Sequence, residues 1–343
     1  MRFGMKTGKI SESILKRSVL GKIKTRRKEI QKGAGAGEDC AFLAWGDTEL
    51  CPAAVSTQTC TLPVKRVTYY AIMAAANNLA ASGAVPAAVT LSLTLPQEAE
   101  EAVLKELMEQ AEECCGELNI QIAGGHTEVS GAVNWPVVTA TVIGKAAVKR
   151  EDPNERHKVC EGHKDVVVSK WIGIEGTAIL VREKEEELLK RFSPGFLGAA
   201  REQERYLSVE REAAIALKSS VYAMHDVRNG GIFGALWELS RKLGVGLSID
   251  LKEIPVKQET IEICEFFNIS PYELLSGGAL IMAAEDGNGL VRELKKAGIA
   301  ASVIGRTNDS NDRLILNGEE TRYLGPPGPD EIYKIAFKEE RIG

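Results

Sequence analysis

The sequence predicts an α+β protein of two domains, and three observations support this prediction. The chain has 343 residues, a length typical of two or three domains. Short runs with strand-like alternation are mixed with helical patterns, without the regular spacing of a doubly wound sheet. A polar connector, KREDPNERHK at 149–158, separates two regions of different texture. We therefore predict an N-terminal domain over residues 1–150 and a C-terminal domain over 151–343.

The first region alternates strands and helices. The segment from Val67 to Ser82 is apolar on every side, which predicts a buried helix, and residues 97–118 form an acid-led amphipathic pattern, which predicts a second helix. A short apolar run, CAFLAW (40–45), follows the glycine-rich stretch, and strands are predicted at PAAVSTQTC (52–60), AVTLSLTLP (88–96), NIQIAGG (119–125) and WPVVTATVIG (135–144).

The second region has the same mixed character. Helices are predicted within AMHDVRNGGIFGALWELSRKLG (223–244) and GNGLVRELKKAGI (287–299), the latter ended by Gly298. The tail GPPGPDEIYKIAFKEERIG (325–343) predicts a loop followed by a terminal helix. Strands are predicted at DVVVSK (165–170), GLSID (246–250), GGALIMAAED (277–286) and ASVIGRT (301–307).

Composition excludes several classes of protein. The formal net charge of -5 argues against bulk nucleic-acid binding. No stretch approaches the roughly 20 apolar residues of a membrane span. The seven cysteines form no CxxC pair, and the N-terminus lacks the apolar core of a signal peptide, so a cytoplasmic protein is expected.

One segment departs from the overall charge. From Lys16 to Lys32 there are eight basic residues and a single acid, Glu29. A solvated helix face and a patch that contacts phosphate or a partner both remain open. The absence of aromatic residues there argues against base stacking.

The glycine-rich stretch GAGAGED spans residues 33–39. Alternate glycines, including Gly35 and Gly37, let backbone N–H groups approach an anion such as a phosphate. The stretch matches neither the GxGxxG nor the P-loop fingerprint, so a flexible linker is the alternative. Glu38 and Asp39 follow at once, where ligands of Mg²⁺ would stand.

A second candidate is AGGHTEVS at 123–130. Gly124 and Gly125 follow an apolar run, where they would open space for a ligand, and His126, Thr127 and Glu128 would lie at its rim. The alternative is a polar turn between two strands. The P-C-x-x-C half of a zinc deaminase signature is absent, so that chemistry is rejected.

A third candidate is HDVRNGG at 225–231. Gly230 and Gly231 would expose a helix N-terminus, which is a natural anion site, while a simple helix cap is the alternative. His225 is interpreted as a structural histidine. Asp226 and Lys9 are polar residues close to glycine turns.

Two asparagines interrupt the buried helix at AAANNLAASG (74–83). An amide is costly to bury unless its hydrogen bonds are satisfied, so Asn77 and Asn78 require a function or local partners.

Taken in order, the motifs resemble the AIR synthase-related (PurM-like) superfamily, closest to its HypE-like hydrogenase expression/formation branch. The motifs are GK (8–9), GAGAGEDCAF (33–42), STQTCT (56–61), NNLAASGAVP (77–86), GGHTEV (124–129), GIEGTAIL (173–180), HDVRNGGIFGALWELS (225–240) and LLSGGALIMA (274–283). The resemblance implies an α+β N-terminal domain whose sheet pairs with that of a second subunit, and an α/β C-terminal domain.

The resemblance also implies bound ATP, with the glycine-rich loop over the phosphates and carboxylates on Mg²⁺. It assigns catalysis to Asp39 and Lys9 and metal binding to Glu38, Asp39 and Glu128. A homodimer, a small-molecule acceptor and a maturation-partner protein are implied as partners. The implied cofactor-binding residues are Gly35, Gly37, Gln58, Asn78, Gly124, Gly125, His126, Thr127, Asp226, Gly230 and Gly231.

The sequence departs from the family at two acidic positions. Gln58 and Asn78 stand where relatives usually carry aspartate, which weakens the expected metal site. The final residues, ERIG, hold no cysteine, which argues against the self-carbamoylation of HypE. Two hypotheses remain: an enzyme that uses ATP to activate or phosphorylate a small acceptor, and a catalytically degenerate relative with a regulatory or scaffold role.

Overall fold

The structure is a computed structural model of the chain. It describes residues 11–25, 27–44, 52–146, 163–335 and 337. Lys9 and the connector at 149–158 lie outside this part of the chain, so the predicted domain boundary stays a prediction. The described residues form two compact units, each treated separately below: a larger one of 11–25, 27–28, 34–39 and 163–335, and a smaller one of 29–33, 40–44, 52–146 and 337.

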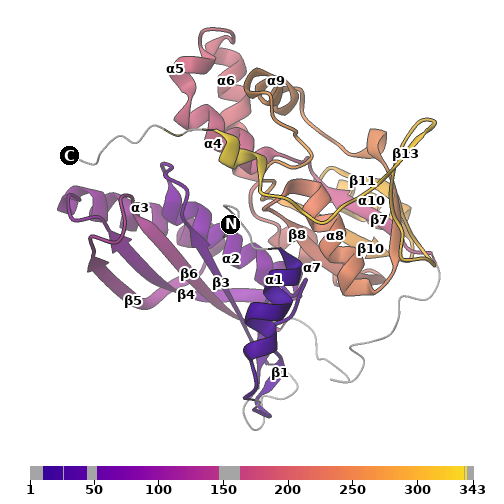
Figure 1. Cartoon of the computed structure of the whole chain (residues 1–343), viewed down its shortest axis with the longest axis horizontal. Helices are drawn as coiled ribbons and strands as arrows, with labels where there is room; N and C mark the ends of the chain where they lie inside the picture. Colours follow the sequence, from indigo (N-terminus) through magenta and orange to yellow (C-terminus); the bar gives the residue numbers. More distant parts are fainter. Residues whose placement is uncertain (1–10, 26, 45–51, 147–162, 336, 338–343) are drawn as a thin grey trace, which may run out of the picture. The chain divides into compact units, whose positions relative to one another are not determined.

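The smaller unit is a sheet covered by two helices, labelled in Figure 1. Its six strands run in the order β1-β2-β3-β6-β4-β5, and only β4 and β5 are parallel, joined through α3. The elements are β1 (Ile30–Lys32), β2 (Ala41–Leu43), β3 (Ala53–Cys60), α2 (Val67–Ala81), β4 (Ala84–Leu95), α3 (Glu101–Leu118), β5 (Gln121–Val129) and β6 (Val137–Ala146).

Helix α2 forms the core of this unit. All of its residues are buried, and it contacts β3, β4, β6 and α3. The uniformly apolar sequence from Val67 therefore predicted this helix correctly. Helix α3 is amphipathic, as predicted, and buries one face that includes Leu107, Ala111 and Cys114.

Strand β5 corrects one sequence-based expectation. Gly124 and Gly125 lie inside the strand, and His126 to Glu128 continue it, so this stretch is neither a strand end nor a turn. A Cβ at Gly125 would lie 2.0 Å from the Leu91 oxygen on β4. Glycine is therefore required here because two backbones approach each other closely.

The larger unit is built on a seven-stranded sheet in the order β13-β12-β9-β11-β7-β10-β8. Only the β9–β12 pair is parallel. The strands are β7 (Asp165–Ser169), β8 (Val221–Val227), β9 (Gly246–Asp250), β10 (Ala279–Ala284), β11 (Ala301–Asn308), β12 (Arg313–Asn317) and β13 (Glu320–Tyr323).

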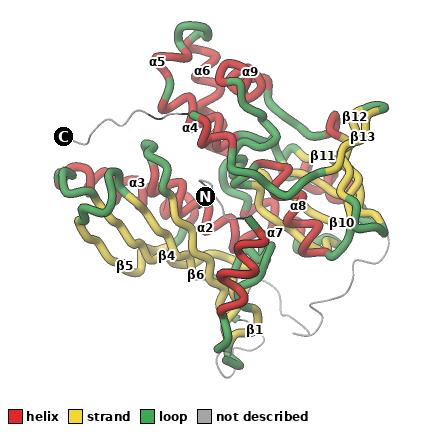
Figure 2. The backbone as a smooth tube through the Cα atoms, in the orientation of Figure 1, coloured by secondary structure: helices red, strands yellow, loops and turns green. Residues whose placement is uncertain are grey.

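The larger unit also contains helices, drawn red in Figure 2. They are α1 (Glu12–Ile14), η1 (Leu15–Val19), η2 (Leu20–Lys22), α4 (Ile174–Glu183), α5 (Glu185–Leu188), α6 (Pro194–Arg201), η5 (Glu202–Tyr206), α7 (Glu210–Ala216), α8 (Gly231–Leu243), η6 (Leu251–Glu253), α9 (Gln258–Phe267), α10 (Gly287–Lys296) and η7 (Glu331–Lys334). None of the helices within the described ranges has the length and apolar character of a membrane span.

Helix α8 packs on the sheet through Ile232, Leu236 and Leu239, which join Val166 and Ile281 in one core. The helix predicted for the tail is present as the short η7. After Ile335, the structure describes only residue 337.

Two glycines at the ends of α8 allow a matched test of this packing. Both have positive φ, 60° at Gly231 and 71° at Gly244, but an added Cβ would lie 2.3 Å from the Tyr272 oxygen only at Gly231. We expect Gly244→Ala to lower the free energy of unfolding by about 1 kcal/mol and Gly231→Ala by about 3 kcal/mol or more. Urea denaturation of both variants checks this, and equal losses would contradict the close contact.

Candidate functional site

The glycine-rich segment and strand β8 meet around one buried carboxylate in the larger unit. Asp39, whose side chain is 4% exposed, pairs through Oδ1 with His225 Nδ1 at 2.6 Å and through Oδ2 with Lys242 Nζ at 3.1 Å. His225 Nε2 contacts Glu238 Oε2 at 2.9 Å, and Lys242 also donates to the Met224 carbonyl oxygen at 3.0 Å. Asp39, His225, Glu238 and Lys242 form the Asp39 cluster, in which the charges of two acids and two bases balance.

The cluster shifts the protonation of its members. Burial alone would raise the pKa of the Asp39 carboxyl, but the charges of His225 and Lys242 outweigh burial and hold it well below its usual range. Burial would lower the pKa of His225, yet Asp39 and Glu238 raise it to about 10. His225 is thus a charged residue of the interior at neutral pH.

The cluster also fixes the glycine-rich segment. Asp39 is the last residue of that segment, and its partners lie on β8 and α8. Gly37 has φ of 78°, and a Cβ there would lie 3.2 Å from the Glu238 carbonyl oxygen. The segment is therefore held against α8 at both Gly37 and Asp39, which argues against a freely flexible linker.

Asp226 follows His225 on β8 and is also buried. Ligand atoms of Asp39, His225 and Asp226 lie within 4.8 Å of one another, the spacing of a metal site. However, both oxygens of Asp39 already face cations of the protein, and a charged imidazole cannot ligate a metal. The donor set as described therefore fits a resident Mg²⁺ poorly.

The predicted anion site at Gly230 is filled by the chain itself. Asp330 accepts hydrogen bonds from the backbone N–H groups of Gly230 at 2.6 Å, Ile332 at 2.9 Å and Leu275 at 3.1 Å. Burial raises the pKa of Asp330 to about 6 despite these bonds. The helix N-terminus does bind a carboxylate, and that carboxylate comes from the tail.

A second buried carboxylate, that of Glu175, binds the glycine motif LLSGG (274–278). Glu175, on α4, accepts a hydrogen bond from the Gly277 N–H at 3.1 Å and pairs with Arg228 at 3.2 Å. The loops HDVRNGG and LLSGG are thus both held by buried acids of other segments.

The smaller unit places the two family-divergent amides in one layer. Asn78 on α2 donates a hydrogen bond to the Ser56 hydroxyl on β3 at 3.0 Å. Gln58 stands two residues further along β3, on the same face as Ser56. Gln58 therefore lies on the sheet face that Asn78 contacts.

The residues of GGHTEV lie differently. In register with β4, Gly124, His126 and Glu128 share the sheet face of Ser92 and Thr94, which is opposite to the face of Gln58. His126 Nε2 lies 3.5 Å from Glu128 Oε2. Gly125 and Thr127 take the other face. The residues predicted for one cofactor site are therefore divided between two faces of this sheet.

The cysteines do not supply a nucleophile in the described part of the chain. Those described there are free and buried: Cys40, Cys60, Cys114, Cys115 and Cys264. Burial raises the pKa of the Cys264 thiol to about 12, which disfavours the reactive thiolate. Cys51 and Cys160 lie outside the described residues.

The pH dependence of stability tests the Asp39 cluster. Between pH 6.5 and about 10, folded His225 keeps a proton that the unfolded chain has released, so stability falls as pH rises. Asp39 stays ionised in both states there. We expect Asp39→Asn to cost about 3 kcal/mol at pH 6 and less at pH 9. Urea denaturation in EDTA measures this, and a pH-independent difference would contradict the ion pair.

Known protein families and curated proteins resemble this chain in sequence. The chain matches the AIR synthase related protein, N-terminal domain, over residues 37–146, and the corresponding C-terminal domain over residues 161–317. It is 25% identical over 315 residues to a protein of Methanocaldococcus jannaschii provisionally named a hydrogenase expression/formation protein, covering 90% of this chain and 91% of the relative. It is 23% identical over 242 residues to the carbamoyl dehydratase HypE of Rhodobacter capsulatus, covering 69% and 68%.

Solved structures share the fold. A HypE–HypF complex aligns with a TM-score of 0.69 at 21% identity, over 92% of this chain and 100% of the other. HypE in complex with ATP gives 0.67 at 17% identity, over 96% and 98%. ThiL complexed with AMPPCP and TMP gives 0.66 at 17% identity, over 93% and 96%. The predicted two-domain PurM-like fold is thus confirmed, and since the two family models together match more than half of its residues, the chain belongs to the AIR synthase-related family.

Proposed function

We propose that this protein binds ATP and uses it to activate or phosphorylate a small acceptor. The observation that carries the proposal is the anchored glycine-rich segment: residues 33–37 alternate glycine and alanine, which lets backbone amides approach an anion, and the Asp39 cluster holds their end against α8. Preorganised amides bind phosphate without an ordering cost at the moment of binding. Relatives of the same fold have been solved with ATP and with AMPPCP, which supports the nucleotide class.

We propose that Mg²⁺ binds together with the nucleotide. Mg²⁺ commonly binds through one or two carboxylates together with substrate phosphates and waters. Gln58 and Asn78 are uncharged, and Asp39 is neutralised by two cations, so the free protein offers little attraction for the metal. Glu38, in the larger unit, is the carboxylate we assign to it. When bound, the metal would offset charge on the transferring phosphoryl group.

A regulatory or scaffold role is the second candidate. It is favoured by the same neutralised carboxylate and by the two amides, which together leave three of the family's acidic positions, 39, 58 and 78, without net charge. The likeness to HypE from a HypE–HypF complex makes a maturation-partner protein the natural ligand of such a form. Turnover separates the two candidates, because only the enzyme releases ADP or AMP.

Calorimetric titration with ATP, with and without Mg²⁺, tests the primary proposal. We expect binding in both conditions, tighter with Mg²⁺, and release of ADP or AMP once an acceptor is present. Binding without turnover across small acceptors favours the scaffold role. No binding in either condition contradicts both candidates.

Restoring the acids tests whether Gln58 and Asn78 stand at a lost metal site of the smaller unit. We expect Gln58→Asp with Asn78→Asp to raise Mg²⁺ affinity about tenfold or more, because two negative charges are returned to one layer. Gln97→Asp with Asn134→Asp adds the same charge at exposed positions of the same unit and serves as the control. Equal effects of the two pairs in a Mg²⁺ titration would contradict the placement.

We further propose that the sheet of the smaller unit pairs with a second copy of the chain. One sheet face carries rows of hydroxyls that bond across β3 and β6, Thr57 to Thr141 at 3.0 Å and Thr59 to Thr139 at 2.9 Å. Ile143 on the same face is 36% exposed. A sheet face of small and apolar side chains is suited to packing against another sheet.

Light scattering during gel filtration tests the dimer. We expect a dimer for the wild type and a monomer for Ile143→Lys, because a charge would be buried between the sheets. Met108 on α3 is equally exposed at 36%, so Met108→Lys is the matched control and should remain dimeric. A monomeric wild type, or the same state for both variants, would contradict the proposed surface.

A further inference from the structure

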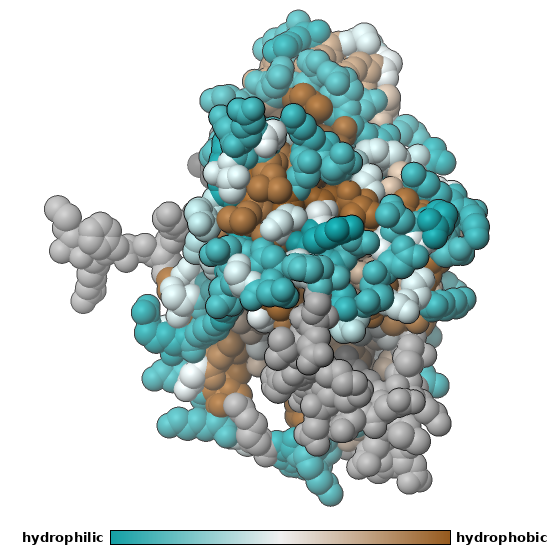
Figure 3. All heavy atoms as spheres, turned by 90° about the vertical axis from the view of Figure 1, so that its right-hand side faces the viewer, coloured by the Kyte–Doolittle hydropathy of each residue, from teal (hydrophilic) through white to brown (hydrophobic). Residues whose placement is uncertain are grey.

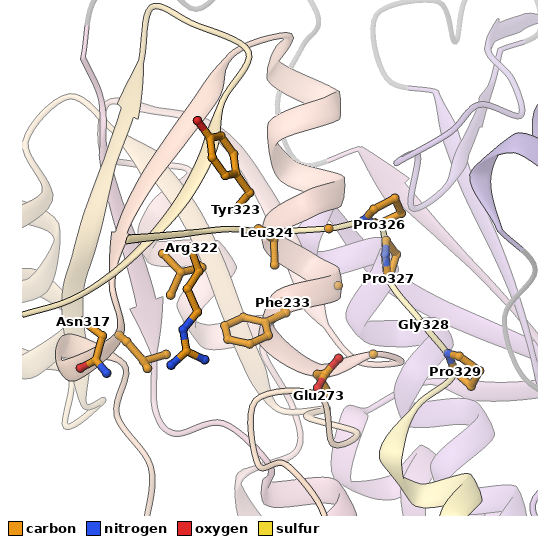
Figure 4. A pocket seen from close by; sticks show the side chains of 15 residues that line it. Phe233, Glu273, Asn317, Arg322, Tyr323, Leu324, Pro326, Pro327, Gly328 and Pro329 are labelled. Atoms are coloured by element: carbon orange, nitrogen blue, oxygen red, sulfur yellow. The ribbon is translucent and has the colours of Figure 1, made fainter. Parts of the chain in front are cut away.

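A cavity of about 250 Å³ opens in the larger unit beside the N-terminal half of α8. It lies where α8, the β12–β13 hairpin and the proline-rich segment 324–329 meet (Figure 4). Every residue that lines it belongs to the larger unit. Much of the lining comes from residues beyond 317, where the match to the family's C-terminal domain ends. The residues after 317 therefore supply much of the cavity wall.

The walls are apolar and held in place. The ring of Phe233 stacks on Tyr272, with centroids 5.4 Å apart and an interplanar angle of 10°. Pro327 packs over Gly234 of α8 and over Gly230, the residue before the helix, since a Cβ at either glycine would lie 3.7 Å from Pro327 Cβ. Phe233 and Pro327 thus present flat apolar surfaces whose positions are fixed before any ligand arrives.

The proline-rich segment is anchored beyond the cavity. Asp330 bonds to the Gly230 and Leu275 amides, as described above, and Ile332 is almost fully buried. Glu331 accepts a hydrogen bond from the Ser270 N–H at 3.1 Å. The cavity is therefore preformed, which lowers the cost of binding.

Two side chains of opposite charge, Glu273 and Arg322, also line the cavity. The carboxylate of Glu273 receives no hydrogen bond from the described residues, and burial, with the nearby Glu331, raises its pKa. Arg322 donates to Glu320 through Nη2 at 3.1 Å, which leaves most of its five N–H groups available. Figure 4 shows Arg322 and Glu273 on opposite sides of the Phe233 ring, with Asn317 beside Arg322. Figure 3, which views the molecule from the side where Figure 1 labels β13, shows hydrophobic surface between hydrophilic rims.

We propose that this cavity binds a small, flat compound with an N–H donor at one end and a carboxylate or similar anion at the other. The apolar body lies between Phe233 and Pro327, the donor faces Glu273, and the anion faces Arg322 and Asn317. The cavity is just below the ~300 Å³ of ordinary ligand pockets, which restricts the ligand to about the size of an amino acid. This site is independent of the proposed ATP chemistry.

Saturation-transfer NMR with 4-(aminomethyl)benzoate tests the proposal on the full chain. Benzylamine and benzoate are the matched probes, each lacking one charged end. We expect the bipolar probe to bind with a Kd of about 1 mM, and each single-ended probe several-fold more weakly. No saturation transfer to any of the three at 10-fold the expected Kd, about 10 mM, overturns the proposal.

Charge-neutralising variants assign the two ends. We expect Arg322→Gln to weaken 4-(aminomethyl)benzoate and benzoate about three- to tenfold and to leave benzylamine unchanged. Glu273→Gln should weaken 4-(aminomethyl)benzoate and benzylamine and leave benzoate unchanged. Both positions are partly or largely exposed, so folding is preserved. Arg292→Gln and Glu265→Gln make the same changes at exposed positions outside the cavity and should have no effect. Equal responses of all four variants would contradict the assigned cavity.

Discussion

The buried carboxylate of Asp39 is the interaction on which the candidate site depends. It joins the glycine-rich segment to a strand and a helix that lie almost two hundred residues further along the chain, through His225 at 2.6 Å and Lys242 at 3.1 Å. Burying a charge is costly unless opposite charges and hydrogen bonds compensate it. Here Glu238 completes a balanced set with His225, so the cost is offset and the segment is held in one place.

This arrangement gives the carboxylate a structural role. A carboxylate that faces two cations attracts a divalent ion weakly. The Asp39 cluster is thus poorly suited to bind free Mg²⁺.

The local sequence pattern predicted a helix or strand correctly where one physical effect dominates. The uniformly apolar run from Val67 predicted α2, and the alternation at residues 52–60 predicted β3. The glycine pair at 124–125 was misinterpreted because glycines suggest turns, whereas both lie inside β5 and at Gly125 the Leu91 backbone approaches too closely for any side chain. The pattern of a single strand contains no information about that neighbour.

The partners within the site could not be predicted for a related reason. Lys242 lies four residues after Glu238, so their shared helix face was visible, but its pairing with Asp39 depends on the tertiary fold. The proline-rich tail suggested only a loop, and the amide that Asp330 binds at Gly230 lies 100 residues earlier. Contacts of such separation are set by packing of the whole unit.

Amide hydrogen exchange across residues 33–37, with and without ATP, tests the central claim most directly. The account predicts that ATP slows exchange in the wild type. It also predicts that Asp39→Asn exchanges faster in this segment and loses the response at the same ATP concentration. Exchange at 33–37 that ATP leaves unchanged in the wild type would contradict the claim that this anchored segment binds the nucleotide.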